Sequence, residues 1–496
     1  MADALIVGAG VGGLSAAIAL AARGLRVQVL EAGPRPGGKM GIAVIDGVEV
    51  DTGPSVLTLP DTLDRTFRLA GTSLADELTL REPEPAFRYL YPDGVSLDVH
   101  ARPEATLRSV QATLGRAAAD ELAAFLAYAG RIWDAAAPHF VHGPAPSMAS
   151  LARGGLGSLA LLPRIDPLRT MWGAIRARVR DPHLRWLLAR YATYNGSDVR
   201  RAPATLHCIA HVELTLGGFG VQGGMYEIVR ALARAAERLG VRIDCDARVD
   251  GLLVREGRIR GARTADGREW AADAVIGNAD AAHVLGDLLP RASRPRRGAA
   301  PPSTSGWVGI LRARRREAMD ARVAHTVLFP GEYMQEFADM FDRGRPPADP
   351  TVYLCAQEAC HGRAGWADDE PVFVMANAPA EPAGGSSPAT WDALRGTVLR
   401  RLDAAGLRGA GDGLVWERTP SALAEQFPGS RGSIYGAASN SALAAFRRPA
   451  NRVPGVRGLY LASGSAHPGG GVPLCVLSGH AAAAALLADR GASVDR

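Results

Sequence analysis

The chain has 496 residues, of which 47% are hydrophobic and 22% are charged, and it carries a net charge of +5. It is too long for a single hydrophobic core, so we expect two or three domains, and its composition is that of a globular protein rather than a disordered one. The positive charge comes from scattered arginines without a lysine-rich tail, which argues against nucleic acid as a partner.

The five cysteines form neither a C-x-x-C pair nor a disulfide framework, which is typical of a reducing cytoplasm. They are Cys208, Cys245, Cys355, Cys360 and Cys475. His207 and His211 are four residues apart beside Cys208, but the segment has neither an H-E-x-x-H pattern nor a third ligand, so we expect no metal site.

The first predicted element is a short apolar strand, Ala4 to Val7, that runs into a glycine-rich turn and an alanine-rich helix, Leu14 to Ala22. Gly8, Gly10 and Gly13 form a G-x-G-x-x-G set at this turn, the pattern of a dinucleotide-binding loop. In order, they permit the tight turn, the approach of a pyrophosphate and close packing of the helix on the strand. The amides at the helix N-terminus would face the diphosphate.

A second strand, Val27 to Leu30, ends at Glu31, at the distance expected for hydrogen bonds to an adenosine ribose. Arg35 to Lys39 follows with two glycines, including Gly38, and a cation for the diphosphate side; Lys39 is the only lysine of the chain. This extension resembles the R-x-G-G-R/K segment of flavoproteins whose dinucleotide domain is built like that of amine oxidases, so it favours FAD over a nicotinamide. The alternative is a glycine-rich turn in an ordinary α/β protein.

Two long uncharged stretches, Ala4 to Ala22 and Gly458 to Ala488, could be mistaken for membrane spans. The first has no basic segment before it and contains the glycines of the phosphate loop. The second is interrupted by Pro468 and Pro473 and by three glycines. We predict no transmembrane segment and no cleaved signal peptide.

The next predicted elements are a hairpin over Gly41 to Asp51 and a strand pair over Tyr89 to Asp98. The pattern from Pro103 to about Gly196 is helical and rich in alanine and arginine.

Within this helical region, Leu162 to Arg190 carries an apolar stripe at helical spacing, flanked by arginines. The stripe comprises Ile165, Leu168, Met171, Trp172, Ile175 and Val179, and the arginines are Arg169, Arg176, Arg178 and Arg180. It has two interpretations: a surface helix that packs on its own domain, or an interfacial helix whose apolar face enters a bilayer while the arginines reach the headgroups.

A second glycine cluster, Gly217 to Gly224, precedes a predicted helix, Met225 to Leu239. No G-K-S/T follows, so a nucleoside triphosphate loop is excluded. Short strands between Ala247 and Ala272 form a predicted meander, and the apolar strand Ala274 to Asp280 suits a buried parallel sheet. The dinucleotide domain is therefore predicted to be discontinuous.

Four later strand-like runs predict a second, mixed sheet that would carry the substrate floor. They are Gly306 to Leu311, His325 to Phe329, Thr351 to Ala356 and Pro371 to Asn377. The predicted fold is α/β, with a Rossmann-like FAD-binding domain of the amine-oxidase type, a mixed-sheet substrate-binding domain and a helical, membrane-associating insert. The predicted boundaries are 1–75, 215–290 and 455–496 for the first, 76–102 and 296–454 for the second, and 103–214 for the insert.

The last predicted strand begins at Gly458 and meets another glycine-rich turn and another helix N-terminus. Backbone amides in such a turn can face a second anionic or electron-rich group. We therefore expect Gly464, Gly471 and Val472 to hold the flavin end of the cofactor.

In its motifs the chain resembles the bacterial carotenoid desaturases related to phytoene desaturase, over nearly its whole length. The resemblance rests on the N-terminal fingerprint with Asp51 to Pro54, on Arg190 to Tyr194 with Ala202 to Thr205, on Gly223 to Met225, and on His467 to Pro473, which is the most specific. Within the family, His325 to Phe329 and Phe427 to Gly436 are most like the 1-hydroxycarotenoid 3,4-desaturases, also called methoxyneurosporene dehydrogenases.

The resemblance implies an FAD-dependent oxidoreductase of carotenoid biosynthesis that introduces a double bond beside the polyene of an acyclic carotenoid, here a 1-hydroxy- or 1-methoxycarotenoid. A hydride would leave to flavin N5, and loss of the neighbouring proton would complete the double bond. This chemistry requires a cofactor, an apolar tunnel and exclusion of water rather than acid–base groups. No catalytic residue is assigned; His467 is the best-placed ionisable residue, and its alternative role is in the turn.

Three other functions stay open: a phytoene desaturase proper, another oxidase on the same scaffold that acts on an amine or a porphyrinogen, and a non-catalytic lipid-binding module of the GDP-dissociation-inhibitor type. The expected partners are the carotenoid, a membrane surface and an electron acceptor such as oxygen or a quinone. The expected location is peripheral, on the cytoplasmic side of a bacterial inner membrane.

Overall fold

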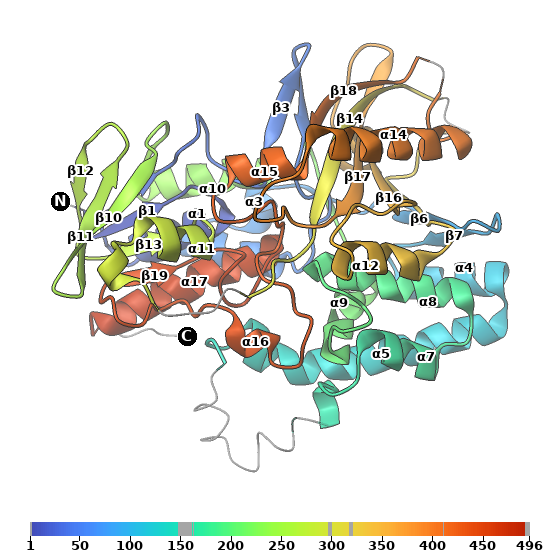
Figure 1. The fold of residues 1–496 in the computed structure, drawn as a ribbon, viewed down its shortest axis with the longest axis horizontal. Coiled ribbons are helices and arrows are strands. Elements are labelled where there is room, and N and C mark those ends of the chain that lie inside the picture. The colour runs from blue at the N-terminus through green and yellow to red at the C-terminus, as the bar shows by residue number, and fades with distance from the viewer. Residues whose placement is uncertain are drawn as a thin grey trace.

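A computed structural model describes residues 2–146, 161, 163–295, 300–316, 321–409 and 411–491. They form two sheet-based units side by side, one around β1 (Ala4–Val7) and one around β14 (Ser305–Arg314). A layer of helices lies below the second unit in the view of Figure 1.

A five-stranded parallel sheet forms the centre of the first unit. Its spatial order is β19 (Leu459–Leu461), β13 (Val275–Gly277), β1, β2 (Val27–Leu30) and β9 (Arg242–Asp244). All four residues of β1 are buried, because both faces of a parallel sheet are covered. The sheet thus contains strands from the first, middle and last parts of the sequence, in agreement with a discontinuous dinucleotide domain.

Helices α1 (Val11–Ala21), α10 (Tyr226–Arg238) and α17 (Val472–Asp489) pack together beside this sheet. Gly479 of α17 lies against the backbone of α1 at Gly12, so these two helices are in close contact. By length and hydropathy α17 could span a membrane, but 56% of it is buried inside the protein, as in a core helix.

The second unit is built on a seven-stranded mixed sheet, which confirms the predicted strands. Its order is β18 (Gly413–Arg418), β14, β17 (Asp369–Ala378), β16 (Val352–Ala356), β15 (His325–Leu328), β6 (Phe87–Leu90) and β7 (Ser96–Val99). β15 and β6 run parallel, and the other neighbouring strands that the structure describes are antiparallel. Trp391 and Leu394 of α14 (Pro388–Ala404) belong to the core on one face of this sheet.

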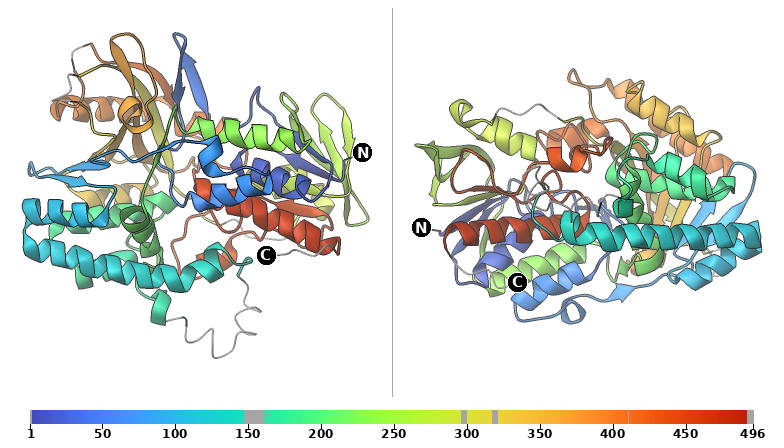
Figure 2. Two further views of the ribbon diagram at one scale, coloured as in Figure 1. Left: turned by 180° about the vertical axis from the view of Figure 1, so that it is seen from behind. Right: turned by 90° about the horizontal axis from the view of Figure 1, so that it is seen from below.

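The helical segment packs against β6 and β15 through a core of aromatic and aliphatic side chains. Its helices are α4 (Pro103–Leu114), α5 (Arg116–Ala136), α7 (Met171–Arg178), α8 (Pro182–Ala189) and α9 (Cys208–His211). The right view of Figure 2, which looks at the molecule from below, shows α5 running along the face that points down in Figure 1.

The apolar stripe predicted in Leu162 to Arg190 is part of this core, so its interpretation as a bilayer-inserting face is wrong. Met171, Ile175 and Val179 are fully buried, although Leu168 is 90% exposed; Leu162 lies outside the described residues. Helical periodicity identifies an apolar face but not what covers it, and here the protein's own helices cover it.

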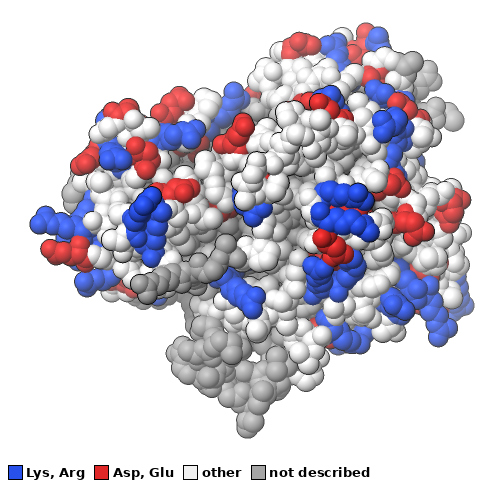
Figure 3. All heavy atoms as spheres, viewed as in Figure 1, with Lys and Arg blue, Asp and Glu red and all other residues white. Residues whose placement is uncertain are grey.

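The predicted hairpin and meander are confirmed, and the remaining described elements are short. They are β3 (Ile42–Ile45), β4 (Val48–Asp51), β5 (Leu80–Arg81), β8 (Gly220–Val221), β10 (Val249–Arg255), β11 (Arg258–Thr264), β12 (Glu269–Ala271), α2 (Asp61–Leu69), α3 (Leu74–Glu77), α11 (Ala281–His283), α12 (Tyr333–Phe341), α13 (Gln357–His361), α15 (Pro420–Gln426) and α16 (Ala444–Arg447). On the face drawn in Figure 3, basic and acidic side chains are mixed rather than gathered by sign.

Candidate cofactor and substrate site

A cavity of about 900 Å³ runs from the glycine loop of the first unit to the sheet and helices of the second. This volume lies near the upper end of the range of roughly 300–1,000 Å³ for small-molecule sites. The first unit contributes Gly10, Glu31 and Gly38 to its walls, and the second unit contributes Tyr194 and Tyr353. The predicted cofactor and substrate regions therefore share one chamber.

The loop between β1 and α1 has the geometry that its glycines require. Gly8 has φ +102°, and Gly10 is the N-cap of α1. A side chain at Gly13 would overlap the Gly8 carbonyl, so this glycine allows the helix to pack closely on the strand. The structure gives Gly10 a second reason to be glycine besides the approach of a pyrophosphate. A Cβ at this position would lie 2.7 Å from Asn278 Oδ1, so a larger residue would displace Asn278 as well as narrow the path of a diphosphate.

Glu31 lines the cavity and holds the loop through both carboxylate oxygens. The backbone N–H of Ala9 donates to Oε2 at 2.7 Å, and that of Gly33 donates to Oε1 at 2.8 Å. Each carboxylate oxygen can accept a further hydrogen bond, so Glu31 can order the loop and still bind a ribose.

The loop after β2 brings Gly38 beside the first glycine loop, where a Cβ on Gly38 would contact Gly10 Cα at 3.5 Å. Lys39 also lines the cavity, but its Nζ donates to the carbonyl oxygens of Ser433 at 2.7 Å and Ile434 at 3.3 Å. Burial lowers the pKa of Lys39. This lysine therefore joins the two units, and its direct role at a diphosphate stays a prediction.

The C-terminal glycine turn brings Gly464, Gly471 and Val472 to the same cavity. Gly471, with φ +106°, is the N-cap of α17, so the turn presents a helix N-terminus there. Arg448 Nη1 donates to the Gly464 carbonyl at 2.9 Å and so fixes the turn.

The sequence did not reveal three arginines in the cavity wall: Arg190 and Arg448, which are buried, and Arg418, which is half-buried. Burial lowers the pKa of Arg418 and that of Arg448 to about 10, so both stay positively charged at neutral pH. With Lys39 they give the cavity the positive charge that a diphosphate requires. The sequence offers no local signal for Arg418 or Arg448, and Arg190 stood out only as part of a family motif.

His467 is buried, and its Nε2 bonds to the Gly143 carbonyl at 2.9 Å. Burial lowers its pKa, which keeps the imidazole neutral. The side chain ties the C-terminal turn to the end of the helical segment, which favours the turn role over proton transfer.

The histidines and cysteines singled out in the sequence do not converge on one point. His207 Nε2 bonds to the Met171 carbonyl at 3.1 Å, whereas the ring of His211 lies against Gly130 of α5. A different group, His325, Cys355 and Cys360, brings its donor atoms within 4.8 Å of one another.

This second group is already hydrogen-bonded within the protein. His325 Nε2 lies 3.4 Å from Cys360 Sγ, and His325 Nδ1 lies 2.8 Å from the Tyr353 hydroxyl. Burial raises the pKa of the Cys355 thiol to about 12, whereas a metal ligand must be a thiolate. The group forms a layer of the wall behind Tyr353.

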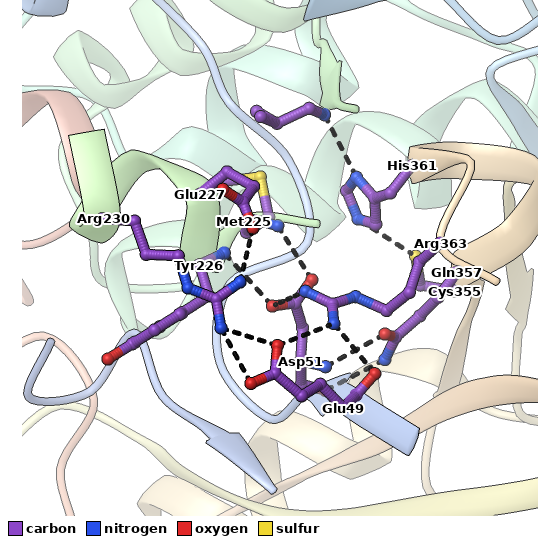
Figure 4. Close-up of polar contacts among 11 residues, drawn as sticks. Glu49, Asp51, Met225, Tyr226, Glu227, Arg230, Cys355, Gln357, His361 and Arg363 are labelled. Atoms are coloured by element: carbon purple, nitrogen blue, oxygen red, sulfur yellow. Dashed lines mark hydrogen bonds and ion pairs between the residues drawn. The ribbon is translucent and has the colours of Figure 1, made fainter. Parts of the chain in front are cut away.

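Asp51, which precedes the cavity residues Thr52 and Gly53, connects the two units (Figure 4). Its carboxylate accepts the backbone N–H groups of Met225 at 2.8 Å and Tyr226 at 3.1 Å at the start of α10. Arg363 of the second unit pairs with the same carboxylate at 3.2 Å, and Gln357 of α13 bonds to the Asp51 backbone. The second glycine cluster therefore serves this junction, since a side chain at Gly224 would overlap Arg363.

These residues fit FAD. The cavity offers two glycine turns at helix N-termini, a carboxylate for a ribose, cations for a diphosphate and, beyond them, a mainly aromatic and apolar chamber for the flavin ring and a substrate.

Residues 11–310 match the model of the family described as flavin-containing amine oxidoreductases. The chain belongs to this family. The hydroxyneurosporene desaturase of Rhodobacter capsulatus is 36% identical over 98% of both chains, which confirms the resemblance to carotenoid desaturases. The 4,4'-diapolycopene oxygenase of a Methylomonas species is 31% identical, again over 98% of both chains.

Solved structures share the fold at low sequence identity. Cyclohexylamine oxidase from Brevibacterium oxydans superposes with a TM-score of 0.61 and 16% identity over 99% of both chains. A Rab GDI from Plasmodium falciparum superposes with a TM-score of 0.51 and 13% identity, covering 84% of this chain and 87% of that one. The scaffold therefore occurs both in oxidases and in a protein of the GDP-dissociation-inhibitor type, so the site must decide the function.

Proposed function

We propose that the protein is an FAD-dependent carotenoid desaturase that introduces the 3,4 double bond of an acyclic 1-hydroxy- or 1-methoxycarotenoid. The observation that carries this proposal is the continuous cavity, in which a dinucleotide site opens directly into an aromatic, apolar chamber. The near full-length similarity to hydroxyneurosporene desaturases supports the same substrate class.

The chain's own residues bind, orient and exclude water in this reaction. When bound, FAD supplies the acceptor for the two electrons that leave with one hydrogen, and the second hydrogen leaves as a proton. Glu31 and the glycine loops hold the cofactor, while Tyr194, Tyr353 and Phe373 would position the polyene and keep the reacting bond dry.

The charge at the substrate end of the cavity disfavours an amine oxidase. Arg190 lines the chamber beside Tyr194 and Tyr353, and it would repel the ammonium form of an amine substrate. A carotenoid is uncharged and does not meet this penalty.

The proposal is tested with purified protein loaded with FAD and supplied with a 1-hydroxylated acyclic carotenoid. Oxygen and a water-soluble quinone are offered in separate arms, because the electron acceptor is part of the proposal. We expect a product that has lost two hydrogens by mass spectrometry and absorbs at longer wavelength. A product that has gained oxygen would indicate an oxygenase, and an amine-dependent reduction of the flavin would indicate an amine oxidase; either would contradict the proposal. Protein that binds no FAD would indicate the GDP-dissociation-inhibitor type of function.

We further propose a peripheral membrane contact at the mouth of the cavity, because a carotenoid partitions into the bilayer and must be taken from it. Leu168 is 90% exposed and Leu443 is 51% exposed, and both line the cavity. Phe140 and Phe446 line the same cavity, and their ring centroids are 6.4 Å apart. Of the apolar stripe predicted in Leu162 to Arg190, the proposed contact keeps only the exposed Leu168, and we propose that the rim lies on the cytoplasmic face of the membrane.

A further inference from the structure

Arg190 is a buried cation without a carboxylate partner among the described residues. It lies in a 3₁₀ segment, Arg190–Asn195, that follows α8, and it is 7% exposed. Its Nη1 donates to the hydroxyl oxygens of Tyr194 at 2.8 Å and Tyr89 at 3.2 Å. The carboxylate of Glu213, whose charge contributes to raising the pKa of Arg190, accepts a hydrogen bond from the Tyr191 hydroxyl at 2.9 Å. Arginine this deeply buried is normally paired, so its retention needs an explanation.

Aromatic rings surround the guanidinium on several sides. The carbon Cζ of Arg190 lies 4.9 Å from the ring centroid of Tyr194 and 5.7 Å from that of Tyr353, with Phe87 at 5.6 Å and Tyr89 at 5.7 Å. These contacts stabilise the charge and hold the side chain in one orientation.

Two nitrogens of this guanidinium, Nε and Nη2, donate to no acceptor in the described part of the chain. Both nitrogens keep some solvent-accessible surface, whereas the unpaired Nε of Arg363 has none. Arg190 lines the cavity, as do Tyr194 and Tyr353 beside it. The free donors of Arg190 therefore open into the chamber.

Arg190 lies near the flavin end of that chamber. The 3₁₀ segment that carries Arg190 ends at Gly196, which lies against Ser303, and Ser303 Oγ accepts the backbone N–H of Tyr435 at 3.0 Å. Tyr435 in turn lies against Gly470 of the C-terminal glycine turn, since a Cβ on Gly470 would come within 2.9 Å of Tyr435. A substrate whose reacting bond lies over the flavin would thus have its nearby end group close to Arg190.

We propose that Arg190 is a specificity-determining residue whose Nε and Nη2 bind an oxygen atom at the end of the carotenoid, next to the bond that is desaturated. This inference rests on the proposed function. A guanidinium has donors only, so it binds a hydroxyl oxygen or an ether oxygen equally well and finds no partner on a hydrocarbon end. A hydrocarbon would leave two buried donors unpaired, so the site selects the oxygenated substrate.

The test compares three substrates with the same polyene: the 1-hydroxycarotenoid, its 1-methoxy ether and the hydrocarbon. FAD-loaded full-length protein is assayed for kcat/KM by product chromatography, and for Kd by quenching of tryptophan fluorescence. In Arg190→Met we expect kcat/KM for both oxygenated substrates to fall about 10- to 100-fold. We expect the value for the hydrocarbon to stay within about threefold, so the preference collapses.

Two further variants keep the result interpretable if Arg190→Met loses stability. Arg190→Lys keeps a cation and a donor, and we expect it to retain part of the preference. Arg178→Met is the matched control, because Arg178 lies 3.8 Å over the ring of Tyr128, does not line the cavity and should leave the preference unchanged.

An equal loss for all three substrates in Arg190→Met, or an unchanged preference, would overturn the inference. If wild-type protein converts none of the substrates, the proposed function fails. The Kd values then still test the role of Arg190. If wild-type protein binds the hydroxylated compound and the hydrocarbon with equal affinity, the inference is overturned. If wild-type protein binds the hydroxylated compound more tightly and Arg190→Met loses this difference, the inference is supported.

Discussion

Glu31 has two tasks at the residue scale, because the carboxylate that orders the glycine loop also faces the cavity. Glu31→Gln removes the negative charge and replaces one carboxylate oxygen by an NH₂ group. This group cannot accept a hydrogen bond from the backbone N–H of Ala9 or Gly33. We expect FAD binding to weaken by roughly 1.5–3 kcal/mol, measured by titration of flavin fluorescence. The control is Glu237→Gln, an exposed change on α10. Unchanged FAD affinity in Glu31→Gln would show that this carboxylate does not serve the cofactor.

His207 makes stability depend on pH. Burial lowers its pKa from 6.5 to about 4 in the folded protein, so the fold holds it neutral. The contribution of neutral His207 to the free energy of unfolding is fully present above pH 6.5, the ordinary pKa of histidine. It is lost as the pH falls from 6.5 towards 4, because protonation then favours the unfolded chain. The loss reaches up to roughly 3 kcal/mol.

We expect His207→Gln to reduce this decline when urea unfolding is compared between neutral pH and about pH 5. His139→Gln, at an exposed histidine, is the control and should keep the wild-type decline. A wild-type decline in His207→Gln would assign the pH dependence to other groups.

At the scale of elements, the Asp51 junction fixes the hairpin β3–β4, the start of α10 and Arg363 to one another. Asp51→Ala removes the nearer carboxylate of buried Arg363 and leaves it only Glu49, at 4.0 Å, so we expect a loss of about 3 kcal/mol in the free energy of unfolding, at the low end for a broken buried pair. Adding Arg363→Met should restore part of this loss, because it removes the uncompensated charge.

The control for this junction is Asp98→Ala. Asp98 pairs with Arg88 at 2.7 Å in a more exposed position, where such pairs contribute about 1 kcal/mol or less. Equal effects of Asp51→Ala and Asp98→Ala on chemical denaturation would mean that the Asp51 junction is an ordinary surface pair.

The sequence was most informative where the physical signal is local. The glycine turns, the hairpin at Asp46-Gly47 and the strands of both sheets other than β18 follow from spacing and turn chemistry, and the structure has them. Arg190, Arg418 and Arg448 carry no such signal, because they come together in the cavity wall only through long-range packing. For the same reason, the sequence could not show that the apolar stripe predicted in Leu162 to Arg190 is mostly buried, because the residues that cover it lie elsewhere in the sequence.

At the scale of the whole molecule, the apolar rim of the cavity predicts how the protein meets a membrane. Leu168→Asp with Leu443→Asp places two charges on the exposed rim, so we expect weaker co-sedimentation with anionic liposomes and unchanged FAD content. Higher salt should weaken binding further if arginines contribute.

The matched control for the rim is Val44→Asp, at a residue 56% exposed on β3 that does not line the cavity. If Val44→Asp releases the protein from liposomes as strongly as the double variant, or if the double variant binds like wild type, the contact lies on another surface.

The parallel sheet has a consequence for synthesis on the ribosome. β1 is joined to β19 through β13, and α1 is covered by α17, so segments that are translated far apart in time complete one another. Until α17 is translated, the nascent chain therefore leaves uncovered the side of α1 that α17 covers, although this mainly apolar helix is buried in the finished fold. The turn that brings Gly464, Gly471 and Val472 to the cavity follows β19, so a polypeptide that stops before β19 lacks part of the predicted cofactor site as well as the cover of α1.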